Sequence, residues 1–307
     1  PMRRALEEVF GDRLVFRRFP SEEELRVADV VIQSVGRIDS EGWDQPFDLP
    51  AAEEAKVRRA VALNPHTIVV INAGSGINMT AWHEGAAAIL YAWYPGQVGN
   101  RALAEILAGR VNPSGKLPCT IERRFEDSPA YGYMPGSGRF YRDWSVDSDF
   151  SQPVYDVRYA EGILMGYRWY DAKGFSPLFA FGHGLSYTTF AYDELEVEVR
   201  EGEGEPLVDV SFAVRNTTWV PGAEVTQLYV GDERSSVLRP IRELKRFRRV
   251  SLEPYAEERV EFTLRPRDLA FWDPRNRSWR WEPGFFTLSI GGASDRLPLQ
   301  ARFELRA

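Results

Sequence analysis

Cysteine is nearly absent from this sequence, and its scarcity excludes several kinds of site. The one thiol, Cys119, cannot form an internal disulfide or a zinc centre built on several thiolates. Histidine occurs only three times, and no group of histidines and acidic residues has the spacing of a metal site. The sequence therefore predicts no metal and no other cofactor.

Long apolar runs and an excess of positive charge are missing as well. No run approaches the ~20 apolar residues of a membrane-spanning helix, and a net charge of -7 disfavours nucleic acid or an anionic membrane as a partner. The glycine-rich turn at residues 73–76 lacks the lysine of a phosphate-binding loop, so we expect no nucleotide. No signal peptide is visible in the sequence, and residue 1 is a proline where a translated chain starts with methionine. We expect the chain to continue upstream, and the compartment is left open.

Residues 1–125 alternate helical and strand patterns, which predicts an α/β layer with a mostly parallel sheet. A serine followed by glutamates, starting at Ser21, has the form of a helix capping box. The runs at 30–35 and 85–93 predict buried strands, as does the nearly unbroken apolar run at 67–72. Helices are predicted over residues 3–10, 51–63 and 98–108.

The second half of the sequence has a different character. Residues 126–188 form an aromatic-rich connecting segment with little periodicity, which is typical of a region that packs against another surface. Residues 189–307 show short alternating strands separated by turn residues, the pattern of an immunoglobulin-like β-sandwich. Since no cysteine pair is present, a fibronectin type III-like domain is favoured.

One loop carries the strongest candidate for chemistry. Glu41 follows the strand at 30–35, at the sheet edge where ligands bind in open α/β folds. Asp39, Glu41 and Asp44 put three acids within six residues, and crowding of like charges raises a carboxyl pKa toward that of a general acid. Trp43 offers a flat face on which a sugar could stack. A solvated acidic loop without chemistry is the alternative.

Several motifs occur in a fixed order along the chain. They are Ala-Trp-Tyr-Pro-Gly-Gln at 92–97, Asn-Pro-Ser-Gly-Lys-Leu-Pro at 112–118, Gly-Tyr-Arg-Trp-Tyr-Asp at 166–171, Phe-Gly-His-Gly-Leu-Ser-Tyr-Thr at 181–188 and Gly-Ala-Glu-Val-Thr-Gln-Leu-Tyr-Val at 222–230. From about Val30 to its end, the chain resembles the C-terminal half of glycoside hydrolase family 3 enzymes of the β-glucosidase type.

The resemblance implies a role for the loop. Family members carry the general acid/base glutamate in a Glu-Gly-aromatic-Asp motif, which Glu41 to Asp44 match, although Gln45 replaces the usual arginine. Trp43 is then a candidate substrate-binding residue. The nucleophilic aspartate of the family lies on an N-terminal (β/α)8 barrel, which is absent from these 307 residues. The α/β domain normally begins with an earlier strand too, so we expect its sheet to be incomplete at the N-terminus.

The resemblance thus predicts part of a retaining exo-β-glycosidase, most simply a β-glucosidase acting on a small saccharide or an aryl β-glucoside. The barrel would be a partner domain on the same or a separate chain, and this chain alone would be inactive. Glu41 argues against the N-acetylglucosaminidase branch of the family, whereas a β-xylosidase stays open. A non-catalytic carbohydrate- or protein-binding scaffold that has lost the barrel is the alternative from another class.

Three further features have a structural and a functional interpretation. His183 stands between two glycines, and a histidine held in a tight turn is favoured over a sugar ligand or a base. Trp279 and Trp281 alternate along a strand, where packing is favoured over a carbohydrate platform. The aromatic segment at 128–170 is expected to cover the junction between the α/β domain, the sandwich and the barrel.

Overall fold

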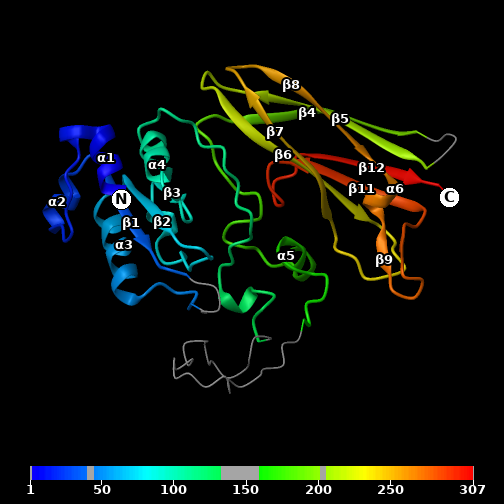
Figure 1. The fold of residues 1–307 in the computed structure, drawn as a ribbon, viewed down its shortest axis with the longest axis horizontal. Helices are drawn as coiled ribbons and strands as arrows, with labels where there is room; N and C mark the ends of the chain where they lie inside the picture. The colour runs from blue at the N-terminus through cyan, green and yellow to red at the C-terminus, as the bar shows by residue number, and fades with distance from the viewer. Residues whose placement is uncertain (1, 40–44, 133–158, 201–204, 307) are drawn as a thin grey trace. The chain divides into compact units, whose positions relative to one another are not determined.

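The computed structural model describes residues 2–39, 45–132, 159–200 and 205–306 (Figure 1). Glu41 and Trp43 lie outside these residues, and so does most of the aromatic segment at 128–170. The chain divides into two compact units, residues 1–111 with 121–160 and residues 112–120 with 161–307. The expected boundaries at 125 and 188 remain predictions.

The first unit is an α/β layer built on a three-stranded parallel sheet in the order β1-β2-β3 (Figure 1). Its strands are β1 (Val31–Gly36), β2 (Thr67–Asn72) and β3 (Ala88–Tyr91). Its helices are α1 (Met2–Phe10), α2 (Glu22–Val27), α3 (Ala51–Leu63) and α4 (Gly99–Leu107), with short 3-10 turns η1 (Gly11–Arg13), η2 (His83–Gly85) and η3 (Phe125–Asp127). The parallel α/β layer predicted from the sequence is confirmed.

Local side-chain hydrogen bonds set the ends of these helices. Ser21 opens α2 with the expected capping box, because its Oγ accepts from the Glu24 amide at 3.1 Å while the Glu24 carboxylate accepts from the Ser21 amide at 2.8 Å. Asn64 ends α3, and its side-chain amide donates to the carbonyl oxygens of Leu25 at 2.8 Å and Ala28 at 2.7 Å. This buried asparagine therefore joins the ends of α2 and α3.

Burial differs between the strands. Val69, Val70 and Ile71 of β2 are fully buried, as expected for a central strand. The prediction that residues 30–35 and 85–93 form buried strands was wrong, since most of β1 and β3 is partly or fully exposed. Both are edge strands of the described sheet. β3 is also shorter than predicted, because the 3-10 turn η2 occupies residues 83–85.

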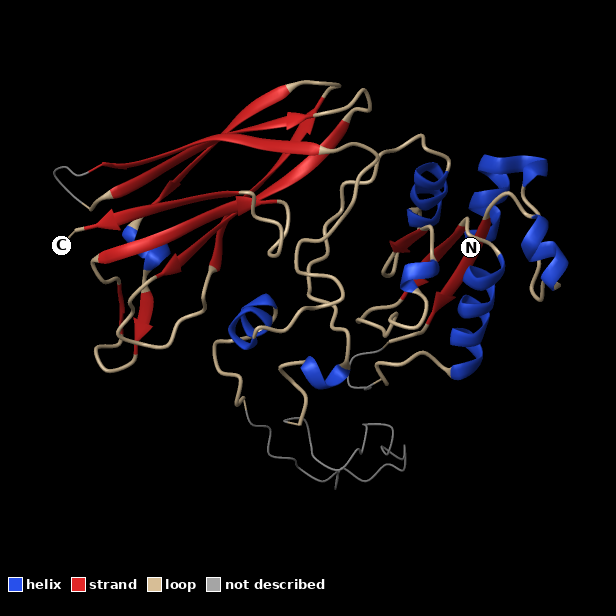
Figure 2. Cartoon of the chain, turned by 180° about the vertical axis from the view of Figure 1, so that it is seen from behind, coloured by secondary structure: helices blue, strands red, loops and turns tan. Residues whose placement is uncertain are grey.

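The second unit is the β-sandwich (Figure 2). A four-stranded sheet in the order β12-β11-β6-β7 packs on a three-stranded sheet in the order β4-β5-β8. The bounds are β4 (Phe190–Arg200), β5 (Leu207–Asn216), β6 (Gly222–Asp232), β7 (Glu243–Leu252), β8 (Glu257–Leu264), β11 (Gly284–Gly291) and β12 (Leu299–Leu305), with helices α5 (Tyr167–Lys173) and α6 (Pro266–Leu269) and a hairpin of β9 (Phe271–Asp273) and β10 (Ser278–Arg280). The fibronectin type III-like fold is confirmed.

The core of the sandwich follows from the alternation along its strands. Inward residues of both sheets, such as Phe212, Leu228 and Leu288, are fully buried and belong to one cluster. Trp281 packs against this cluster, whereas Trp279 lies on the separate hairpin and meets Trp272 edge to face with ring centroids 5.8 Å apart. The two tryptophans therefore do not form one platform, which supports the packing interpretation.

The segment at residues 112–120 is bound to the sandwich through polar contacts. Lys116 Nζ lies 2.9 Å from Glu224 Oε1 and donates to the Gly184 carbonyl at 2.9 Å, and both charged side chains are largely buried. The Asn112 side chain donates to the Pro221 carbonyl and accepts from the Tyr187 amide. The Asn-Pro-Ser-Gly-Lys-Leu-Pro motif thus serves to attach this segment.

His183 takes part in the same attachment. Its carbonyl oxygen accepts from the Leu117 amide at 2.8 Å, and its ring lies 5.0 Å from that of Phe179. The preceding Gly182 has a φ of +83°, which a glycine adopts without strain. Burial lowers the pKa of His183 and favours its neutral form. These contacts support the structural interpretation of this histidine.

We predict that Lys116→Met destabilises the sandwich unit by about 3–5 kcal/mol, because the buried Glu224 carboxylate would lose its counter-charge. The measurement is the thermal unfolding of the intact protein by calorimetry. Arg200→Gln is the control, since it removes the arginine of an exposed pair with Asp209 and should leave the melting temperature nearly unchanged. Equal melting temperatures for the two variants would contradict the prediction.

Candidate active site

The candidate site lies at the edge of the sheet where all three strands of the first unit end. Because the strands are parallel, the segments that follow them meet at this edge. They are residues 37–39 after β1, residues 73–76 after β2 and residues 92–94 after β3. Glu41 follows the first of these segments in the sequence, two residues after Asp39.

Asp39 fixes the start of that loop. Its Oδ2 accepts hydrogen bonds from the amides of Gly74 at 2.6 Å and Ser75 at 3.1 Å, and from the Ser75 hydroxyl at 3.2 Å. Its own amide donates to the Tyr94 hydroxyl oxygen at 2.6 Å. One residue thereby joins the chain after β1 to the segments that follow β2 and β3.

Arg37 contacts the chain on both sides of residues 40–44, at Asp39 and at Pro46. Its Nε is 2.8 Å from Asp39 Oδ1, an ion pair rather than a directed hydrogen bond, and its side chain is only 9% exposed. Its Nη1 donates to the carbonyl of Pro46, which follows the loop. Its Nη2 donates to the Ser75 hydroxyl at 2.7 Å and the Gly76 carbonyl at 3.1 Å.

Close packing reinforces these hydrogen bonds. A Cβ at Gly74 would lie 2.9 Å from the Tyr94 ring and 3.3 Å from Asp39 Oδ2, so only glycine fits at this position. The hydroxyl of Tyr91 donates to the carbonyl of Ser75. Trp93, between the two tyrosines, has a φ of +52°, an uncommon conformation for a tryptophan that tends to occur at functional sites.

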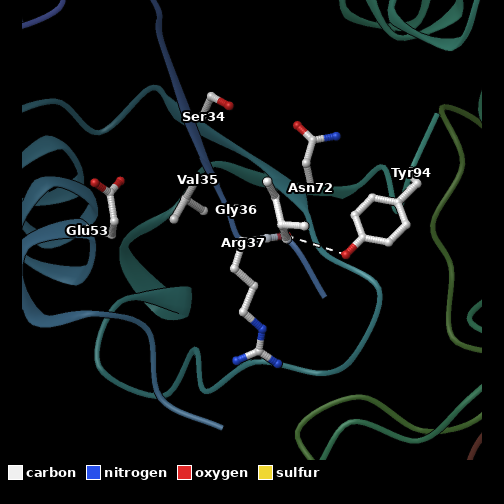
Figure 3. A pocket seen from close by; sticks show the side chains of 8 residues that line it. Ser34, Val35, Gly36, Arg37, Glu53, Asn72 and Tyr94 are labelled. Carbon is white, nitrogen blue, oxygen red and sulfur yellow. Dashed lines mark hydrogen bonds between the residues drawn. The ribbon is translucent and has the colours of Figure 1, made fainter. Parts of the chain in front are cut away.

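A pocket of about 390 Å³ opens beside these residues (Figure 3). Its charged lining groups are the guanidinium of Arg37 and the carboxylate of Glu53 from α3. Its other lining residues are Ser34, Val35, Gly36, Ile38, Asn72 and Tyr94. The pocket shares Arg37 and Tyr94 with the contacts that hold Asp39.

The structure changes the interpretation of the acidic loop. Asp39 was expected to raise the pKa of Glu41 by like-charge crowding. Its charge is instead compensated by Arg37 at 2.8 Å, and its Oδ2 is engaged by backbone amides. Crowding by Asp39 is therefore a weaker argument than its anchoring role. Glu41, Trp43 and Asp44 lie outside the described residues.

Sequence reasoning also missed a second carboxyl group near this edge. A Cβ at Gly76 would lie 3.9 Å from Glu122 Oε2, which places Glu122 beside the segment that follows β2. Burial raises the pKa of Glu122, and the nearby charge of Asp127 adds to the effect. Only its position after the apolar Ile121 hinted at this burial.

Within residues 2–39, 45–132, 159–200 and 205–306, no three His, Cys, Asp or Glu side chains gather in a way that could hold a metal ion. In the same ranges, no helix has the length and apolar character to cross a bilayer.

The chain matches two known domain families. Residues 19–187 match the glycosyl hydrolase family 3 C-terminal domain, and residues 224–294 match a fibronectin type III-like domain. The chain is 40% identical over 269 residues to the β-glucosidase BoGH3A of Bacteroides ovatus, and the aligned region covers 87% of this chain and 34% of that protein. It is 36% identical over 277 residues to the thermostable β-glucosidase B of Acetivibrio thermocellus, again covering 34% of the relative. The chain thus spans about a third of the length of these curated relatives.

Solved structures show the same relationship. The β-glucosidase of Bifidobacterium adolescentis superposes with a TM-score of 0.82 at 32% identity, covering 95% of this chain and 42% of that one. β-Glucosidase 3B of Thermotoga neapolitana, solved with α-D-glucose, gives a TM-score of 0.79 at 31% identity, covering 97% and 42%.

We predict that Gly74→Ala destabilises the first unit by about 1–3 kcal/mol, because the added methyl group overlaps the Tyr94 ring and must displace it. Thermal unfolding of the intact protein measures the effect. Gly115→Ala is the matched control, since a Cβ there meets no atom within 4 Å. Two variants of wild-type stability would show that the sheet edge can accommodate the methyl group.

Proposed function

This chain belongs to glycoside hydrolase family 3, and we propose that it is the acid/base-bearing part of a retaining exo-β-glycosidase, specifically a β-glucosidase. The complete enzyme would remove terminal non-reducing β-D-glucosyl residues from small saccharides and aryl β-glucosides. The names of the relatives support glucose as the sugar. β-Xylosidase activity is the variant that a different sugar subsite on the barrel would produce.

In the proposed mechanism, Glu41 acts twice. It first donates its proton to the glycosidic oxygen while the bond from that oxygen to the anomeric carbon breaks and an aspartate of the barrel forms an ester with that carbon. The resulting Glu41 carboxylate then takes a proton from water, which attacks the anomeric carbon and releases the sugar and the aspartate. Trp43 would stack against the substrate beside this carboxyl group.

The observation that carries this proposal is the anchoring of the chain on both sides of Glu41. A general acid must be held within hydrogen-bond reach of the oxygen that it protonates. Asp39 binds the segments after β2 and β3, and Arg37 reaches Pro46 beyond the loop. A solvated acidic loop without function would not need such anchors.

The chemistry also requires a second carboxylate about 5 Å from Glu41. We assign that nucleophile to a barrel domain outside this chain, consistent with the third of the relatives' length that the chain spans. We therefore predict that the purified chain of 307 residues does not hydrolyse an aryl β-glucoside. Turnover that persists after barrel-containing contaminants are removed would refute the assignment.

In the complete enzyme, we predict that Glu41→Ala lowers kcat/KM for an alkyl β-glucoside by about 10²- to 10⁴-fold, because the leaving alkoxide would lack a proton donor. For dinitrophenyl β-glucoside, kcat/KM should change little, since that leaving group departs without protonation. Azide should raise kcat on the dinitrophenyl substrate, because it attacks the glycosyl-enzyme without a general base.

Glu84→Ala serves as the control, since its side chain is 88% exposed and lies outside the loop. It should match the wild-type enzyme on both substrates. If Glu41→Ala slows both substrates equally and azide has no effect, Glu41 is not the acid/base.

A further inference from the structure

We propose that Arg37 and Asp39 are positioning residues that hold Glu41 in its catalytic orientation, with the Tyr94 hydroxyl as their support. This inference rests on the proposed function of Glu41. It concerns three described side chains, none of which would touch the reacting atoms. Their role would be to fix the chain from which the acid/base projects.

Asp39 is close enough to Glu41 to determine where it lies. Covalent geometry keeps the α carbon of Glu41 within about 7 Å of that of Asp39, because only two residue steps separate them. Asp39 is held through three separate groups, since Oδ2 accepts from two amides, Oδ1 faces Arg37 and its amide donates to Tyr94. Few degrees of freedom remain at the point where the loop begins.

Arg37 extends this control to the far side of the loop. A guanidinium has N–H groups directed along several fixed lines, and here Nη1 donates to Pro46 after the loop and Nη2 to Ser75 from the segment after β2. The Nε of the same group forms the ion pair with Asp39 before the loop. A lysine in this place would present a single ammonium group and could not span the same partners. Both ends of the loop are thus joined through one side chain that is 9% exposed.

A carboxylate at position 39 is required by the groups around it. Among the described residues, each polar contact of the Asp39 side chain comes from a donor, namely the amides of Gly74 and Ser75, the Ser75 hydroxyl and the Arg37 guanidinium. An asparagine has a single acceptor oxygen, so its amide NH₂ would face either Arg37 or the two backbone amides. One side of the anchor would then be lost while the size of the side chain stayed the same.

The test compares Asp39→Asn with the wild type in the complete enzyme, using alkyl and dinitrophenyl β-glucosides. A displaced acid/base should lower kcat/KM for the alkyl substrate by about 10- to 100-fold, since a displacement of about 1 Å can cost 10²-fold. For the dinitrophenyl substrate kcat/KM should stay within about twofold. Its kcat should fall and recover with azide, because water attack would lack its base.

Two further variants keep the result interpretable. Tyr94→Phe removes only the hydroxyl that accepts from the Asp39 amide, and it should give the same pattern with a smaller amplitude. Asp209→Asn removes a carboxylate of the sandwich that pairs with Arg200 and accepts from Thr263, and it should behave as wild type on both substrates.

The outcomes separate the two proposals. If Asp39→Asn and Tyr94→Phe slow both substrates equally without azide recovery, or slow neither, the positioning role is overturned. If Glu41→Ala in the same assay shows no dependence on the leaving group, the proposed function itself fails. A dependence seen with Glu41→Ala but not with the positioning variants would refute only the present inference.

Discussion

The ion pair between Arg37 and Asp39 is the interaction on which the candidate site depends. It lies at the end of β1, and both side chains are largely buried. Through Asp39 it reaches the segment after β2, and Tyr94 connects it to the segment after β3. The parallel sheet brings three strand ends together, and the ion pair with its hydrogen bonds fixes the positions of the segments that follow them.

A buried ion pair is a costly way to gain stability, because desolvation offsets most of the attraction between the charges. What the two side chains provide is direction, because the Asp39 carboxylate accepts from the amides after β2 and the Arg37 guanidinium donates to Pro46 and Ser75. An apolar pair of similar size would fill the same space without orienting the backbone. A loop with a chemical task would therefore be held by charged residues rather than by the hydrophobic core.

Much of the fold followed from local sequence signals. The bounds of α3 and β2 were predicted at 51–63 and 67–72, because Asn64-Pro65 ends the helix and the next run is almost wholly apolar. The strands of the sandwich were likewise predicted from their alternating apolar and polar residues. Burial of β1 was mispredicted, because a run of apolar residues does not show whether its strand lies at the centre or the edge of a sheet.

The candidate site could be predicted from the sequence only in part. The position of Glu41 after a strand, together with the family motif, predicts an acid/base loop after β1, and that role stays a prediction. The hydrogen-bond partners of Asp39 lie 35 and more residues further along the chain, and nothing in the spacing of the acids indicated them. Asp39 was therefore grouped with Glu41 as a like charge, whereas its contacts depend on how three strand ends meet.

The attachment of residues 112–120 to the sandwich has a consequence for how the protein is made. Lys116 leaves the ribosome 108 residues before its partner Glu224. Because translation adds about 5–20 residues per second, Glu224 is synthesised roughly 5 to 20 seconds after Lys116. The segment must stay available throughout that interval while the α/β sheet on its N-terminal side can already assemble. The ion pair between Lys116 and Glu224 can thus form only when the sandwich is completed. A pause in translation before Glu224 would lengthen the interval before the pair forms.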